Sequence, residues 1–164
     1  MDLVTALAVV IGIMGGIATW VAVTMGSPYF LIWAVFIAWG SFYACGGKEA
    51  GLQKSAVANL WGALCAAVAL IAAQAMGVTA LTAGLCVGVS VVVLVLGAKV
   101  PALGAIPSSV YGYASTAALV LMGGALGVNA GAIVQAAIAI AVSMVIGNVL
   151  GYISEKIAGS LVKA

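Results

Sequence analysis

The side chains that could do chemistry in this chain are mostly neutral hydroxyls and amides, and they gather in two clusters. The first runs from Trp39 to Gly47, and the second from Pro101 to Thr116. Such groups can replace the hydrogen bonds that water makes to a small neutral solute, or can bond one helix to another within a membrane. We take as candidate pore-lining or substrate-lining residues Ser41, Tyr43, Asn59, Pro107, Ser108, Ser109, Tyr111, Tyr113 and Ser115.

Catalysis lacks the groups that it needs. The chain has no His, its five basic residues are all Lys, and it has three acidic residues. No general base is predicted within the membrane to activate a nucleophile. Cys45, Cys65 and Cys86 fall in separate apolar stretches without companion ligands, so we interpret them as packing residues. The prediction is that the protein is not an enzyme and has no cofactor and no metal site.

Composition places the chain in a lipid bilayer. Apolar residues make up 66% of the 164 residues and charged residues 5%, and the mean hydropathy is +1.38. A soluble domain has about 45–50% apolar and about 25% charged residues. We therefore expect an integral membrane protein whose partners are the bilayer and a small-molecule solute, with no nucleic acid.

The charged residues divide the chain into three uncharged segments, 3–47, 55–98 and 100–154. One span takes about 20 residues, so each segment suits a hairpin of two helices. The run Val91 to Leu96 is apolar on every face, which excludes the alternation of a β-barrel strand. The predicted fold is all-α with six transmembrane helices over roughly 4–24, 29–47, 55–75, 79–98, 103–122 and 130–152.

All five lysines fall on one side of this six-span arrangement. By the positive-inside rule, both termini then lie in the cytoplasm. The predicted organisation is a transmembrane domain over 1–152 and a short cytoplasmic tail over 153–164. The charged stretch Lys48 to Lys54 is predicted to be a solvated loop.

The longest uncharged segment leaves room for a helix break near 101–109. Pro107 removes a backbone donor and disfavours helix at Ile106. Irregular backbone in a membrane must face protein or a water-filled cavity, so we expect 101–116 to line a path or pocket. The alternative is that Pro107 simply occupies the first turn of the fifth helix.

Three spans on each side of a break near Gly77 would form a 3+3 inverted repeat, as in many transporters. Aligning 37–47 with 105–115 pairs Ser41 with Ser109, but the charges put both clusters near the cytoplasm. Inverted equivalents lie at opposite depths, so we attribute this match to chance. The glycine pairs 12/16, 84/88 and 147/151 predict close helix packing, within the chain first and a subunit interface as the alternative. Because a bundle of six spans has little interior of its own, we favour a homo-oligomer.

Three stretches together resemble one bacterial inner-membrane family, domain of unknown function 1097. They are Phe30–Tyr43, Asn59–Ala63 and Ile106–Ser115. The resemblance covers nearly the whole chain and implies a small multi-pass protein of the bacterial inner membrane, but no activity. A fainter resemblance, over one hairpin, links Trp33 or Trp39, Lys54 and Gly62 to exporters of the fusaric-acid-resistance type.

The leading functional hypothesis is a channel or facilitator for a small uncharged or weakly polar solute, because the spans offer hydroxyls and amides but no charge. One alternative is a non-transporting membrane subunit or accessory protein. Another is a cation-coupled secondary transporter of a small metabolite that uses backbone carbonyls near Pro107.

Overall fold

The computed structural model describes residues 1–127 and 129–162, which contain helices, turns and no strand. The predicted all-α class is confirmed. The elements are α1 (Leu3–Met25), α2 (Ile32–Ala44), α3 (Lys48–Ala75), α4 (Ala80–Leu96), the short 3-10 helices η1 (Gly97–Lys99) and η2 (Pro101–Leu103), α5 (Ile106–Met122) and α6 (Ala130–Leu161).

Four of the helices are long and apolar enough to cross a membrane: α1, α3, α4 continued through η1, and α6. The other two are shorter, with 13 residues in α2 and 17 in α5. At 1.5 Å per residue these two rise by roughly 20 and 26 Å, against about 30 Å of hydrocarbon.

At two places the helices extend beyond the predicted spans. The expected loop at 48–54 is helical, because α3 begins at Lys48 directly after two glycines with positive φ, Gly46 and Gly47. The expected tail at 153–164 is helical as far as Leu161, while 163 and 164 lie outside the described residues. Ala158 in this last part of α6 packs with Ala6 and Val10 of α1, which buries an apolar face and extends the helix.

Side-chain caps mark three of the helix starts. The Asp2 carboxylate accepts a hydrogen bond from the Thr5 backbone N–H, and Thr79 forms a capping box with Thr82. The Asn129 side chain caps α6 in the same way, through the N–H of Ala132. These caps satisfy donors that the first turn of a helix leaves unpaired.

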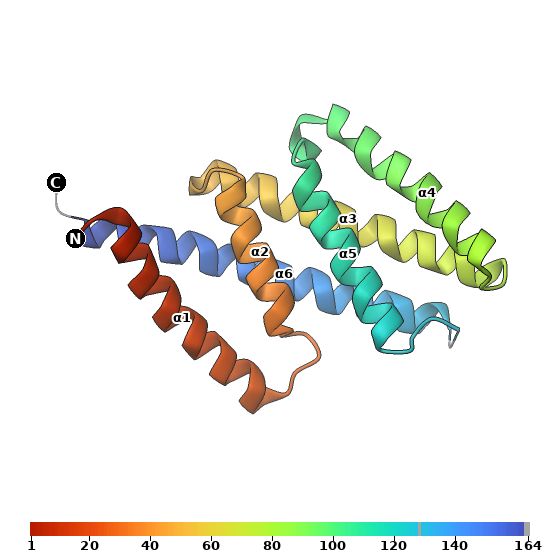
Figure 1. Cartoon of the computed structure of the whole chain (residues 1–164), viewed down its shortest axis with the longest axis horizontal. Coiled ribbons are helices and arrows are strands. Elements are labelled where there is room, and N and C mark those ends of the chain that lie inside the picture. Colours follow the sequence, from red (N-terminus) through yellow and green to blue (C-terminus); the bar gives the residue numbers. More distant parts are fainter. Residues whose placement is uncertain (128, 163–164) are drawn as a thin grey trace.

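The two longest helices, α3 and α6, pack against each other at the centre and run in opposite directions (Figure 1). The helices α1 and α2 pack on α6, whereas α4 and α5 pack on α3. Each half of the chain therefore lays its first two helices on the third helix of the other half. The first three helices and the last three are therefore interlocked.

Close backbone contacts at two glycines show which residues of the two halves of the chain are equivalent. A Cβ at Gly62 of α3 would overlap the Ser109 carbonyl oxygen of α5, and a Cβ at Gly147 of α6 would overlap the Val35 carbonyl oxygen of α2. Val35 of α2 therefore lies against Gly147 of α6 in the way that Ser109 of α5 lies against Gly62 of α3, so Val35 and Ser109 are equivalent positions of the two halves. The same offset in residue number makes Ser41 equivalent to Ser115. The sequence alignment that paired Ser41 with Ser109 therefore has the wrong register.

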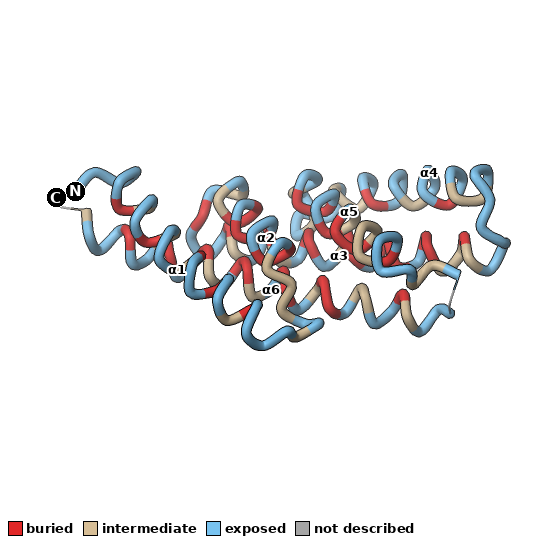
Figure 2. The backbone as a smooth tube through the Cα atoms, turned by 60° about the horizontal axis from the view of Figure 1, so that its bottom comes forward, coloured by how far each residue is buried: buried red, intermediate tan, exposed pale blue. Residues whose placement is uncertain are grey.

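Burial is concentrated between the central helices and is low on α4, where Cys86 and Leu94 are the buried residues (Figure 2). The three glycine pairs behave differently. Gly147 and Gly151 pack against α2, whereas a Cβ added at any of the four glycines of the pairs 12/16 and 84/88 would meet open space. Intramolecular packing therefore explains the pair at 147/151 alone.

The irregular stretch before the fifth helix lies at 97–105 and consists of η1, η2 and short turns. The predicted break is thus present, but earlier than expected, because α5 is regular from Ile106 and Pro107 occupies its first turn. Proline suits this position because its missing N–H would have no partner there. The alternative expectation, that Pro107 occupies the first turn of the fifth helix, is confirmed.

Candidate functional site

A cluster of neutral polar side chains is buried where α2, α3, α5 and α6 meet. We call it the central polar network: Ser41, Ser55, Asn59, Ser108 and Asn148, each at most 1% exposed. Ser55 Oγ donates to Ser41 Oγ (2.7 Å), and Ser41 Oγ donates to Ser108 Oγ (2.8 Å). The network contains no ionisable side chain.

Two asparagines join this network to the backbone and to α6. Asn59 Nδ2 donates to the Ser108 carbonyl (2.8 Å), and Asn148 Nδ2 donates to Asn59 Oδ1 (2.9 Å). The Asn148 Oδ1 atom is buried and has no hydrogen-bond partner within the described residues. Buried amides are costly to leave unpaired, so an open acceptor here is a place where a hydrogen-bond donor would be held.

The packing of glycines brings the network together. Ser55 and Asn59 lie one turn apart on the same face of α3, next to Gly62. A Cβ at Gly112 of α5 would overlap the Asn59 carbonyl, the reciprocal of the contact at Gly62. The backbones of α3 and α5 therefore touch, which lets the short side chain of Asn59 reach the carbonyl of Ser108.

A cavity of about 640 Å³ opens between α2 and α5. We call it the α2–α5 cavity. Three pairs of residues that the shift from Val35 to Ser109 relates lie on its wall: Ile37 with Tyr111, Gly40 with Ala114, and Ser41 with Ser115. The complete lining is Trp33, Phe36, Ile37, Gly40, Ser41, Tyr111, Ala114, Ser115 and Ala118.

A second cavity, of about 390 Å³, lies at the lysine-bearing end of α3. We call it the Lys54 cavity; its lining is Cys45, Ala50, Gln53, Lys54, Val57, Pro101 and Ala102. Cys45 Sγ lies 3.3 Å from Ser108 Oγ. Because Ser108 accepts from Ser41, a chain of three polar side chains links the two cavities.

The candidate residues predicted from sequence separate into groups. Ser41, Asn59 and Ser108 lie in the central polar network, and Ser41, Tyr111 and Ser115 line the α2–α5 cavity.

The remaining candidates lie elsewhere. Tyr43 Oη is 2.8 Å from Ser154 Oγ on α6, and Tyr113 Oη is 2.9 Å from Ser90 Oγ on α4. Ser109 is buried at the crossing with α3, and Pro107 is exposed in the first turn of α5. The structure brings neither Ser109 nor Pro107 to the wall of the α2–α5 cavity.

Sequence reasoning missed Ser55, Asn148 and Cys45 as members of this site. Ser55 follows Lys54 directly, so the positions of the charged residues predict that Ser55 lies at the boundary of a span. The spacing of Ser55 and Asn59, four residues apart, is a signal that could have found the polar face of α3. Cys45 was interpreted as a packing residue, although it contacts Ser108.

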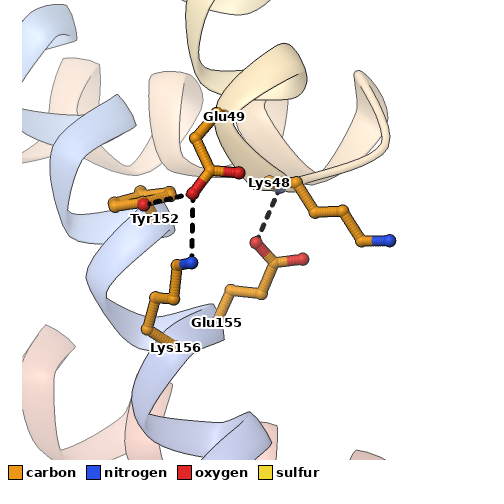
Figure 3. A network of polar contacts seen from close by, with 5 residues as sticks. All are labelled: Lys48, Glu49, Tyr152, Glu155 and Lys156. Atoms are coloured by element: carbon orange, nitrogen blue, oxygen red, sulfur yellow. Dashed lines mark hydrogen bonds and ion pairs between the residues drawn. The ribbon is translucent and has the colours of Figure 1, made fainter.

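A set of charged residues ties the start of α3 to α6 near the lysine-bearing end (Figure 3). Tyr152 Oη (2.6 Å) and Lys156 Nζ (3.0 Å) both donate to Glu49 Oε1, and the Lys48 backbone N–H donates to Glu155 (2.7 Å). The hydrogen bond from Tyr152 and the neighbouring Lys156 lower the pKa of Glu49 to about 2. Glu49 lies before the uncharged segment 55–98, at an exposed position.

Comparison with known proteins decides the family. Residues 8–159 match the family described as Protein of unknown function (DUF1097). The chain belongs to the DUF1097 family. The resemblance inferred from residues of the second, third and fifth predicted spans is thereby confirmed. No curated protein and no solved structure matches this DUF1097 protein, and nothing found supports the fainter similarity to fusaric-acid-resistance exporters.

The site of this DUF1097 protein offers hydrogen bonds and apolar contact. Within residues 1–127 and 129–162, no three His, Cys, Asp or Glu side chains are grouped so that they could hold a metal ion. The central polar network supplies hydroxyl and amide groups that can exchange partners with an uncharged molecule. Its chemistry suits recognition of a neutral solute.

Proposed function

We propose that this DUF1097 protein is a multi-pass protein of the bacterial inner membrane that lets a small uncharged or weakly polar solute cross. The observation that carries the proposal is the link from Cys45 through Ser108 to Ser41. It joins the Lys54 cavity to the α2–α5 cavity without a charged side chain. A solute that carries no charge can replace hydroxyl partners along such a route at low cost.

The route is closed in this structure, because Ser41 and Ser108 are each 1% exposed and bonded to each other. Passage requires the hydroxyls of Ser41 and Ser108 to part, after which a solute occupies the gap and accepts or donates in their place. Ser55 and Asn59 stand behind Ser41 and keep its hydroxyl paired during this exchange. We propose a gated facilitator on this basis.

The membrane topology that we propose has six spans and cytoplasmic termini. In it, α3 crosses from Ser55 onwards, and the short helices α2 and α5 complete their spans with the flanking residues 26–31 and 97–105. Support comes from the contacts of α2 and α5 with the two long helices at the centre. The Lys54 cavity then opens to the cytoplasm, as the positive-inside rule requires for lysine-bearing loops.

We further propose that copies of the protein associate in the membrane. Support comes from α4, where Gly84 and Gly88 lie on an exposed face and each leaves room for a neighbouring helix. Such small residues let helices approach closely in lipid. Chemical cross-linking in nanodiscs measures the association. Replacing Gly84 and Gly88 by Leu is expected to shift the cross-linked species towards monomer. The same replacement at Gly12 and Gly16 tests whether copies associate through α1 instead.

Stopped-flow light scattering on proteoliposomes tests the proposed transport. We expect at least one neutral solute from a panel of urea, glycerol and aromatic amides to equilibrate faster in protein-containing vesicles than in empty ones. Tyr111→Phe and Ser115→Ala are expected to change this rate, with Ser160→Ala as the matched control because Ser160 bonds only within its own helix. No acceleration in vesicles that contain folded protein would contradict the proposal.

A further inference from the structure

We infer that the α2–α5 cavity is a binding site for an uncharged solute with a flat apolar body and one hydrogen-bonding end, such as an aromatic amide. This inference rests on the proposed function and names the class of its solute. It is carried by the composition of the cavity wall and by the unpaired hydroxyl of Ser115.

The wall of the cavity is mostly apolar and partly aromatic. Trp33 and Phe36 from α2 and Tyr111 from α5 provide three rings. The rest of the wall consists of small or aliphatic residues and two serines: Ile37, Gly40, Ser41, Ala114, Ser115 and Ala118. The lining has no charged residue. Its volume of about 640 Å³ lies within the range of small-molecule sites, about 300–1,000 Å³. A fully polar molecule such as urea would leave most of this wall without apolar contact, so we expect a solute with an apolar body.

The polar end of the solute has a defined partner. Ser115 is 3% exposed, lines the cavity, and its Oγ has no hydrogen-bond partner among the described residues. The opposite wall holds Ser41, whose hydroxyl is already bonded to Ser55 and Ser108. The Ser115 Oγ atom is buried just behind the cavity surface, and a buried hydroxyl without a partner is unfavourable. Rotation of this side chain towards the cavity would let a ligand complete its hydrogen bond.

The two halves of the chain explain why Ser115 is unpaired. The offset in residue number that makes Gly62 of α3 equivalent to Gly147 of α6 also makes Ser55 equivalent to Ile140 and Asn59 equivalent to Met144. Ile140 and Met144 are both fully buried apolar residues. The polar support that Ser41 receives from α3 therefore has no counterpart on α6 for Ser115. One wall of the cavity is satisfied by the protein, and the other is left for a ligand.

Photoaffinity labelling in proteoliposomes tests this site with a diazirine-bearing benzamide as the probe. We expect labelled peptides to contain the cavity residues of α2 and α5, with competition by benzamide but not by urea, benzoate or toluene. Ser115→Ala is expected to weaken competition by benzamide about fivefold, the loss of roughly one hydrogen bond.

A steric variant provides the matched control. A Cβ at Gly40, on the cavity wall, meets open space, so we expect the side chain of Gly40→Leu to extend into the cavity. Gly159→Leu adds the same side chain on α6, at an exposed position where a Cβ also meets open space. We expect Gly40→Leu to abolish the labelling and Gly159→Leu to leave it unchanged.

Three results would overturn the inference. Labelling that spreads over α1 and α4 and persists in Gly40→Leu would indicate partition into lipid only. Competition by toluene equal to that by benzamide would show that Ser115 plays no part, and labelling that disappears on mild dilution into monomers would place the probe between copies of the chain. Labelling of the cavity without faster flux would retain the site and reject the transport proposal, whereas faster flux without labelling would do the reverse.

Discussion

Ser41 and Ser115 occupy equivalent positions in the two halves of the chain and line the same cavity, but their hydroxyls have different surroundings. Ser41 Oγ accepts from Ser55 and donates to Ser108, whereas Ser115 Oγ has no partner in the described part of the chain. The difference arises on the neighbouring long helices, where Asn59 on α3 corresponds to Met144 on α6. Of the two equivalent serines, the protein thus provides hydrogen-bond partners for one.

This asymmetry predicts opposite effects of removing the two hydroxyls. Ser41→Ala removes the acceptor of Ser55 Oγ and the donor to Ser108 Oγ, which keep their contacts to Asn59 Oδ1 and Cys45 Sγ. We therefore expect a loss of about 1–2 kcal/mol in the free energy of unfolding. Ser115→Ala removes a hydroxyl that has no partner, so stability is expected to stay the same or rise. Unfolding of the purified protein in detergent, followed by tryptophan fluorescence, measures both, and a larger loss for Ser115→Ala would contradict the assignment.

The crossing of α3 and α5 predicts that Gly62 tolerates no side chain. A Cβ there would overlap the Ser109 carbonyl oxygen. This oxygen belongs to the helical backbone of α5, which cannot move aside as the end of a flexible side chain can. We expect Gly62→Ala to destabilise the protein by about 3 kcal/mol or more, or to prevent its folding. Gly84→Ala adds the same methyl group in open space and is expected to leave the thermal midpoint unchanged. Equal midpoints for the two variants would contradict this packing.

The position of Cys45 predicts that a thiol reagent inhibits transport from one side of the membrane. Its thiol is partly exposed at the Lys54 cavity, whereas Cys65 and Cys86 line an apolar groove between α3 and α4. A membrane-impermeant thiol reagent is expected to modify Cys45 from the cytoplasmic side and to slow solute flux. The Cys45→Ser variant should transport and resist the reagent. Modification from the opposite side alone would reverse the proposed topology.

The contacts of Glu49 predict an acid-dependent loss of stability. Its pKa is lowered from 4.5 in the unfolded chain to about 2 in the folded protein, so its contribution is complete above pH 4.5 and is lost as the pH falls through about 2. Lys156→Met removes one donor and is expected to raise the pKa of Glu49 and to flatten this dependence. Thermal midpoints of both proteins between pH 7 and pH 2 provide the measurement.

Much of the fold could be predicted from the sequence, because hydropathy and eight charged residues define where the chain can leave lipid. The helix starts near 3, 80, 106 and 130 follow from such signals. The helical ends at 48–54 and 153–161 could not be predicted, because they are held by contacts between Glu49 on α3 and Tyr152 and Lys156 on α6. Those contacts join residues about one hundred positions apart.

The site was predictable in its residue types but not in its grouping. Hydroxyls at Ser41, Ser108 and Ser115 were visible as candidates, but Ser109 has the same chemistry and lies at a helix crossing instead. Which serine faces a cavity depends on the rotation of α5 about its axis, and the contacts of Gly62 and Gly112 fix that rotation. The register of the repeat has the same origin, so no alignment of polar residues alone could find it.

The most direct test of the central claim is solute flux in proteoliposomes that hold equal amounts of wild type, Gly40→Leu or Gly159→Leu. The structure predicts that wild type and Gly159→Leu equilibrate a neutral solute faster than empty vesicles, and that Gly40→Leu, with its cavity filled, equilibrates it at the rate of empty vesicles. Equal rates for Gly40→Leu and Gly159→Leu would contradict a route through the α2–α5 cavity.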